Sequence, residues 1–183
     1  MSRDTPEAVF EEARAAVARA DWTTFFSCLD DADVLSLTKN SGLLALSRAE
    51  ELATQFGISL ADLFPRREAL AKAAEAVLGG ADSDRLARSL NVRDLAKQLE
   101  AELELKLRAV QDLAGFAGAI EAAKRAQLGG GTVSSRMFQD EELRDVVVDG
   151  NKARGQRVMS GGSLQPVGFV KKSGSWRIKL RAR

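Results

Sequence analysis

The stretch "DVVVDGNKARGQRVMSGGSLQPVGFVKKSGSWRIKL", residues 145–180, decides the fold, because apolar and polar residues alternate along it with a period of two. Glycine-containing dipeptides divide it at 149–150 or 150–151, at 161–162 and at 173–174, where each supplies a turn. The stretch therefore predicts a meander of four strands, at roughly 143–149, 152–160, 164–172 and 175–181. The segment "TVSSRMF", residues 132–138, is a candidate fifth strand.

The last predicted strand has the clearest pattern. Trp176 and every second residue after it are apolar, whereas the residues between them are cations. A slip of one residue would bury three cations, so the register is strongly specified. If the turn before this strand is a three-residue loop with Gly174 in the left-handed region, Val170 lies opposite Trp176, which gives an apolar pair. A two-residue turn would place Lys171 there instead.

The chain before this sheet has the pattern of helices. Thr5 is a typical N-cap and Pro6 a typical first helical residue, and apolar residues follow at spacings of three and four. These signals predict a helix that ends near Ala20. A second helix is predicted over 22–38, with its aromatic residues on one side.

Only helix signals follow over 41–128, apart from an expected helix end at Gly57 in a left-handed conformation. A single helix over 92–128 would have 37 residues and a length of about 55 Å. Such a helix is too long for a compact domain of this size. We expect a break where Gly115 and Gly118 each weaken the helix by about 1 kcal/mol relative to alanine.

These patterns predict an α+β fold, in which helices pack on a C-terminal antiparallel sheet of four or five strands. A chain of 183 residues is long enough for one well-buried core with an appended subdomain. We therefore expect one domain over 1–183, whose residues 132–183 form the sheet.

Charge is unevenly distributed along the chain. All 26 acidic residues lie at or before Asp149, whereas nine of the 27 basic residues follow residue 150, so the formal charge of +1 divides into −8 and +9. Such asymmetry marks a site for an acidic partner, or it reflects attraction between two parts of one fold. The residues predicted to form a partner-binding basic face are Lys171, Lys172, Arg177, Lys179 and Arg181.

The two ends of the chain resemble a known family. "TPEAVFEEARAAVARADWTTFFSCLDD", residues 5–31, is similar to the opening helices of the nuclear-transport-factor-two-like (SnoaL-like) superfamily, and "DVVVDGNKARGQRVMSGG" with "PVGFVKKSGSWRIKL" to its closing strands. The resemblance implies a cone-like fold in which 43–128 is a long helical insertion. It implies little about function, because this fold carries enzymes, ligand carriers and adaptors.

The residues for catalysis are scarce in this chain. Enzymes of the resembled family use Asp-His or Tyr-Asp pairs, and the chain has no histidine and no tyrosine. The single cysteine, Cys28, lies in an apolar helical segment with no histidine to activate it. The carboxylates at helix ends are explained by capping and by the helix dipole; these are Asp21, Asp30, Asp31 and Asp33.

The chain also lacks the sequence motifs of a calcium site and of a phosphate-binding loop, so we expect no metal and no cofactor. The acidic runs lack the glycine and distal glutamate of a calcium loop, and the glycine-rich 128–135 follows a helix and has no lysine of a phosphate loop. One cysteine excludes an intramolecular disulfide, and the N-terminus has acidic residues where a secretory signal has its apolar segment. We expect a cytoplasmic protein that is not an enzyme, with no cofactor, metal or membrane.

The favoured function is a non-catalytic interaction or adaptor module that binds a protein partner or a second copy of itself. The alternative is a small-molecule binder, or as a less favoured version an enzyme, whose cone pocket is lined by Trp22, Phe26, Val170 and Trp176. Nucleic acid is the less favoured partner, because nucleic-acid sites interleave aromatic residues with their cations, and here only Phe169 and Trp176 are near.

Overall fold

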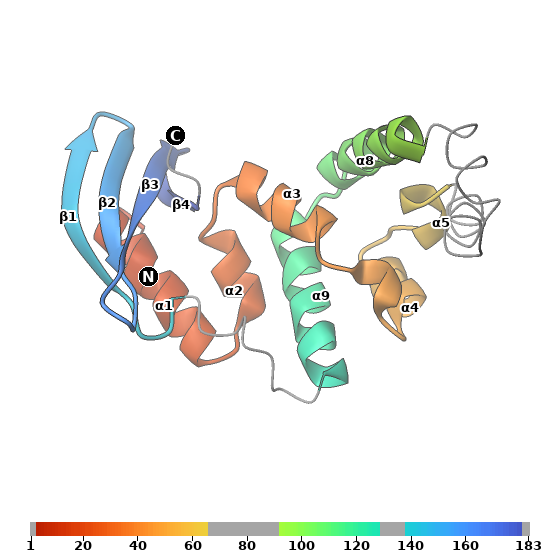
Figure 1. The fold of residues 1–183 in the computed structure, drawn as a ribbon, viewed down its shortest axis with the longest axis horizontal. Helices are drawn as coiled ribbons and strands as arrows, with labels where there is room; N and C mark the ends of the chain where they lie inside the picture. Colours follow the sequence, from red (N-terminus) through yellow and green to blue (C-terminus); the bar gives the residue numbers. More distant parts are fainter. Residues whose placement is uncertain (1–2, 66–91, 129–137, 181–183) are drawn as a thin grey trace, which may run out of the picture. The chain divides into compact units, whose positions relative to one another are not determined.

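A computed structural model describes residues 3–65, 92–128 and 138–180. The chain divides into two compact units (Figure 1): unit 1 comprises Met1–Arg48 and Asp112–Arg183, and unit 2 comprises Ala49–Gln111. Unit 1 contains the sheet and the core that packs on it, and both candidate sites discussed below lie within it.

The sheet of unit 1 has four antiparallel strands in the order β1-β2-β3-β4. This arrangement confirms the predicted α+β fold and its four-stranded meander (Figure 1). Of the candidate fifth strand, 132–137 lie outside the described residues and Phe138 lies in a turn. The strands are β1 (Glu142–Asp149), β2 (Lys152–Val158), β3 (Leu164–Lys172) and β4 (Ser175–Lys179).

Of the two alternatives for the turn between β3 and β4, the structure has the two-residue turn, which the sequence made the less comfortable one. Ser173 and Gly174 both have positive φ, +49° and +85°, and Lys171 is paired with Trp176. The pairing is tolerated because the lysine stem is apolar and its ammonium lies 6.0 Å from the centroid of the Trp176 ring. Val170 consequently does not face the tryptophan.

The outer edge of β4 is covered by two chain segments from the N-terminal part of the chain. The Ile178 amide donates a hydrogen bond to the Cys28 carbonyl at 2.8 Å, and the Asp30 amide donates to the Ile178 carbonyl at 2.7 Å. The Trp176 amide donates to the Arg3 carbonyl at 2.9 Å. These bonds satisfy backbone groups that an edge strand would otherwise leave open.

The same pairing divides the helix that was predicted over 22–38. Two helices are present instead, α2 (Trp22–Ser27) and α3 (Asp31–Lys39), because Cys28 and Asp30 use their backbone groups on β4. The first helix, α1 (Pro6–Ala18), begins as predicted, with the Thr5 hydroxyl accepting a hydrogen bond from the Ala8 amide at 3.1 Å.

The expected break in the helix over 92–128 is present, but it lies at 109–112, before Gly115 and Gly118. Helix α8 (Val92–Arg108) ends and α9 (Leu113–Gln127) begins before either glycine. Asp112 caps α9 by accepting a hydrogen bond from the Gly115 amide at 2.8 Å. Gly118 lies where α9 crosses α2, since a Cβ atom built on it would lie 2.7 Å from the Thr23 amide nitrogen. The glycines therefore serve a cap and a close helix contact.

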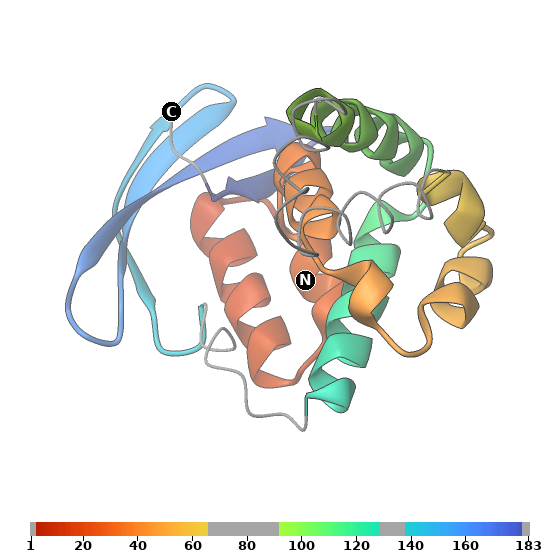
Figure 2. The same cartoon turned by 45° about the vertical axis from the view of Figure 1, so that its right-hand side comes forward.

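The core of unit 1 lies between the inner face of the sheet and α1 and α2, with the sheet curving around α1 (Figure 2). Phe10 and Phe25 both contact the ring of Phe138, at centroid distances of 5.2 and 5.7 Å. Phe169, Trp176 and other alternate residues of β3 and β4 supply the sheet side of this core. The alternation that predicted the strands thus also identified their buried face.

The remaining helices are short. Unit 1 contains η1 (Leu43–Ala45), and unit 2 contains α4 (Ala49–Gln55), α5 (Leu60–Leu63) and α8. Gly57 ends α4 with the predicted left-handed φ of +68°. Within unit 2 the described residues with little exposed surface include Leu60, Leu63 and Leu107.

Candidate functional site

The outer face of the sheet, opposite α1, carries a row of paired residues from all four strands. Val147 on β1 pairs with Arg154 on β2, Arg154 pairs with Gly168 on β3, and Gly168 pairs with Lys179 on β4. Paired residues project to the same face of a sheet, so the two cations flank a position that has no side chain. With strands about 4.8 Å apart, the Cα atoms of Arg154 and Lys179 are separated by about 10 Å.

A hollow of about 570 Å³ lies over this row. Arg154, Lys179 and Lys152 are exposed at its walls, and among the described residues no side chain pairs with any of them. Asp149 is the one acidic residue in the lining. The residues that line the hollow are Val147, Val148, Asp149, Lys152, Ala153, Arg154, Gly168, Phe169, Val170 and Lys179.

Lys152 and Arg154 line this hollow but are not among the cations predicted for the basic face, which all belong to the last two predicted strands. Their signal was the alternation along β2, where Lys152, Arg154 and Gln156 project to one face and Ala153 and Gly155 to the other. The unfilled position at Gly168 had no signal of its own, because it depends on the pairing of three strands.

Of the predicted basic face, Lys172 and Lys171 are engaged within the protein. Lys172 forms ion pairs with Asp30 at 2.6 Å and with Asp31 at 3.2 Å, and the hydrogen bond with Asp30 raises the pKa of its ammonium. Lys171 is directed to the Trp176 ring, as described above. Neither ammonium lines the hollow.

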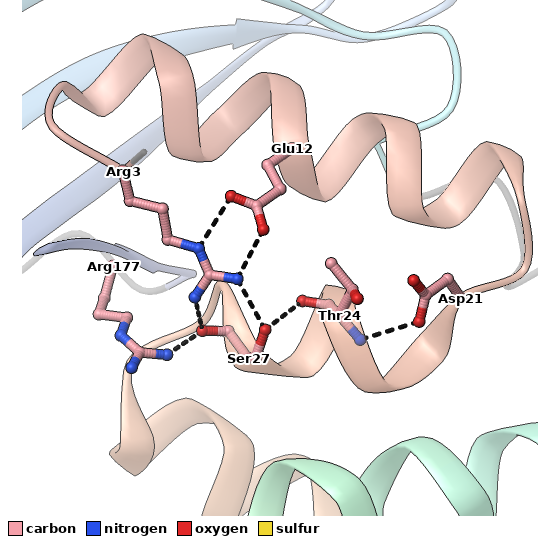
Figure 3. A network of polar contacts seen from close by, with 6 residues as sticks. All are labelled: Arg3, Glu12, Asp21, Thr24, Ser27 and Arg177. Carbon is pink, nitrogen blue, oxygen red and sulfur yellow. Dashed lines mark hydrogen bonds and ion pairs between the residues drawn. The ribbon is translucent and has the colours of Figure 1, made fainter. Parts of the chain in front are cut away.

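Arg177 is also engaged, in a hydrogen-bond network around Ser27 at the end of α2 (Figure 3). Its guanidinium donates to the Ser27 carbonyl, to which Arg3 donates as well at 2.6 Å. Arg3 further donates to both carboxylate oxygens of Glu12, at 2.9 and 2.7 Å, and to the Ser27 hydroxyl at 2.8 Å. Of the five predicted cations, Lys179 alone lines the hollow, and Arg181 lies outside the described residues.

The hydrogen bond from Arg3 lowers the pKa of the Glu12 carboxyl and raises the pKa of Arg3 itself. Both side chains are largely buried, with 14% and 16% of their surface exposed. The ion pair joins the N-terminal segment to α1, and through Ser27 to the end of α2. We assign this network a structural role.

A second buried ion pair lies at the inner face of β2. The Arg157 guanidinium donates to the two carboxylate oxygens of Glu141 at 2.6 and 2.8 Å, with side chains 6% and 2% exposed. Glu141 also accepts a hydrogen bond from the Phe138 amide at 3.0 Å, and Arg157 lies 4.4 Å from the Phe138 ring centroid. The two side chains satisfy each other's hydrogen bonds inside the protein. Arg157 is therefore a further cation of the basic tail that the fold itself uses.

The residues predicted to line a ligand pocket do not line a single cavity. Trp22 and Phe26 line a pocket among the helices of unit 1, whereas Val170 lines the hollow on the outer face of the sheet. Trp176 is buried in the core, with 3% of its surface exposed, and lines neither.

The groups considered for acid-base or nucleophilic chemistry have structural surroundings. Cys28 is fully buried, and burial raises the pKa of its thiol to about 11, so the thiol is protonated at neutral pH. Asp21 caps α2, and Asp33 accepts a hydrogen bond from the Leu180 amide at 2.9 Å. Asp30 and Asp31 are paired with a lysine, as described above.

Within the described ranges, no group of three or more histidine, cysteine, aspartate or glutamate side chains is placed to hold a metal ion. No helix in those ranges has both the length and the apolar character that a membrane crossing requires. Comparisons of the chain with protein-family models, with curated proteins and with solved structures found no match. The resemblance to the nuclear-transport-factor-two-like superfamily accordingly stays a prediction.

Proposed function

We propose that the protein is a non-catalytic interaction module that binds an acidic protein segment on the outer face of its sheet. The observation that carries the proposal is the row Arg154–Gly168–Lys179, in which two unpaired cations flank an unfilled position. A glutamate or aspartate side chain inserted over Gly168 would receive charge-assisted hydrogen bonds from both sides. Lys152 lines the same hollow and would offer a third positive charge to further acidic residues of the partner.

A protein partner is favoured over nucleic acid by the character of the remaining lining. Val147 and Val148 are 51% and 54% exposed at the hollow, which offers apolar contact to a peptide. Proteins that bind single-stranded nucleic acid stack bases on exposed aromatic rings. The one aromatic residue of the lining, Phe169, is buried, so it offers no stacking surface.

Charge also favours an acidic partner over a second copy on this face. A two-fold dimer places the same patch of both copies in contact, which would bring Arg154 and Lys179 near their own counterparts. One aspartate, Asp149, does not balance the three cations of the lining. Self-association, where it occurs, is therefore expected to use another surface.

A non-catalytic role is supported by the structural surroundings of the candidate reactive groups. The Cys28 thiol is buried and protonated, and the carboxylates at helix ends cap α2, pair with Lys172 or accept a hydrogen bond from the Leu180 amide. The nuclear-transport-factor-two-like fold stays an expectation of this proposal. The packing of α1 and α2 on one face of a curved antiparallel sheet supports that expectation.

Binding is tested by fluorescence anisotropy with a rhodamine-labelled peptide of alternating glutamate and valine. A lysine-valine peptide is the charge control, and a single-stranded oligonucleotide of about 20 nucleotides tests the other polyanion. The double variant Arg154→Gln/Lys179→Gln should weaken binding of the acidic peptide by roughly tenfold or more. Arg19→Gln/Lys106→Gln removes the same charge from two exposed positions, one at the end of α1 and one on α8, and should bind as the wild type does.

Three outcomes would overturn the proposal. Absence of binding to the acidic peptide at low salt would remove the interaction itself, since salt screening is then weakest. Equal weakening by the two double variants would show non-specific charge attraction. Binding of the oligonucleotide more tightly than the peptide, with the same dependence on Arg154 and Lys179, would make the face a nucleic-acid site.

A further inference from the structure

A second cavity, of about 210 Å³, lies within unit 1 among α1, α2, α3 and α9. No strand of the sheet contributes to it, so it is separate from the outer-face hollow and from the predicted cone. Its lining residues are Val17, Trp22, Phe25, Phe26, Leu37, Thr38, Asn40, Ser41, Ala117, Ile120, Glu121, Lys124 and Arg125.

Seven of the thirteen lining residues of the cavity are apolar, and three of these seven are aromatic. Trp22 packs edge-on against Phe25 with ring centroids 6.3 Å apart, and Phe25 packs against Phe26 at 5.3 Å. A dry apolar cavity of about 150 Å³ is large enough to hold a benzene ring. A cavity of about 210 Å³ therefore accommodates one ring, or a short aliphatic chain, with a few further atoms.

Two polar groups of the lining lack a partner among the described residues. The Ser41 hydroxyl oxygen is buried and makes no hydrogen bond, and no side chain is paired with the Lys124 ammonium. An unsatisfied buried hydroxyl costs free energy that a ligand acceptor would recover. Both groups donate hydrogen bonds, and the ammonium is positive, so together they select an anionic acceptor.

The other cation of the lining is already neutralised. Arg125 forms an ion pair with Glu121 at 2.7 Å, and its guanidinium carbon lies 3.8 Å from the centroid of the Trp22 ring. This stacking fixes Trp22 as a wall of the cavity and leaves one net positive charge, that of Lys124, for a ligand. A dicarboxylate or a phosphate monoester would carry more charge than this lining balances.

We propose that the cavity binds a small monocarboxylic acid with a single ring or a short apolar chain. The apolar part occupies the aromatic walls, and the carboxylate accepts hydrogen bonds from Lys124 and Ser41. This site goes beyond the interaction function proposed above and shares no residue with the outer-face hollow.

The probe is 3-phenylpropanoate, with its neutral amide as the matched ligand, and affinity is measured by calorimetry and by saturation-transfer NMR. The acid should bind the wild type about tenfold more tightly than the amide, the factor for one charge-assisted hydrogen bond. Lys124→Gln should abolish this preference and leave amide binding unchanged. Ser41→Ala should weaken binding of the acid by a few fold.

Lys106→Gln removes a charge from an exposed position of α8 that lines neither site and is the matched control, so it should bind the acid as the wild type does. No binding of the acid at about 5 mM, or equal affinities for acid and amide, would overturn the assignment. A loss in Lys106→Gln equal to that in Lys124→Gln would also overturn it, as an effect of net charge. The acidic-peptide assay on Lys124→Gln keeps the two proposals separate, because a site confined to this cavity leaves that binding unchanged.

Discussion

Replacement of Gly118 by alanine tests whether α9 and α2 are held in contact by the absence of a side chain. A Cβ atom at 118 would lie 2.7 Å from the Thr23 amide nitrogen and 2.8 Å from its Cα, whereas ordinary contacts begin near 3.4 Å. One of the two helices must therefore move by about 0.7 Å, the difference between 3.4 and 2.7 Å. Helix α2 has little freedom to move, because Cys28 directly after it pairs with β4.

Two opposing effects set the magnitude. Alanine is the better helix former, which favours Gly118→Ala by about 1 kcal/mol. Overpacking typically costs about 1–3 kcal/mol, and more where backbone has to shift. Displacement of α2 also disturbs the buried Phe25 and Phe26, so we expect a net loss of about 1–3 kcal/mol in the free energy of unfolding.

The assay is urea unfolding followed by tryptophan fluorescence. Both tryptophans, Trp22 and Trp176, lie in unit 1, so the signal reports the unit in which the substitution is made. The control is Gly161→Ala, because Gly161 has no atom within 4 Å of its would-be Cβ and does not have a positive φ. A Gly118→Ala protein as stable as the wild type would refute a contact dependent on glycine.

Three further predictions concern buried polar groups. Arg157→Met leaves the Glu141 carboxylate buried without its partner and should cost about 3–5 kcal/mol in urea unfolding. Adding Glu141→Leu should recover much of that loss, and failure to recover would mean that the cation contributes mainly by packing. Glu12→Gln should destabilise the protein at pH 7, because the hydrogen bond from Arg3 lowers the pKa of Glu12. That pKa is depressed in the folded state, so the difference between Glu12→Gln and wild type should shrink as pH falls from about 4.3 through the folded pKa, and a difference constant with pH would contradict it. Cys28 should not react with a disulfide reagent at pH 8 until urea unfolds the protein, and rapid reaction of native protein would show an accessible thiolate.

The strands were predictable because their determinants are local. Alternation and glycine turns placed the ends of all four within two residues of those observed, and the apolar face of β4 was correct from Trp176 onward. The turn at Ser173 was not predictable on the same grounds. A serine in the left-handed region and a lysine opposite tryptophan are each slightly unfavourable, and the contact of the ammonium with the ring forms only in the folded sheet.

The helix boundaries failed where their cause lies far away in the sequence. The interruption after Ser27 results from hydrogen bonds to Ile178, about 150 residues later, so no local signal marks it. A glycine within a helical segment indicates either a weak helix position or a close approach of two helices, and the sequence does not distinguish the two. Gly118 is the second case. The candidate site depends likewise on the pairing of Arg154 with Gly168, which the β2–β3 turn sets.

The basic tail is best understood by asking which of its charges the fold itself uses. Of the nine cations after residue 150, seven lie in the described residues. One forms a buried ion pair, one pairs with two aspartates, one donates to the end of α2 and one lies near an aromatic ring; these are Arg157, Lys172, Arg177 and Lys171. Attraction within the fold therefore explains about half of the asymmetry. The other three cations in the described part of the tail, Lys152, Arg154 and Lys179, line one hollow around Gly168, and such convergence is expected of a surface that binds an acidic partner.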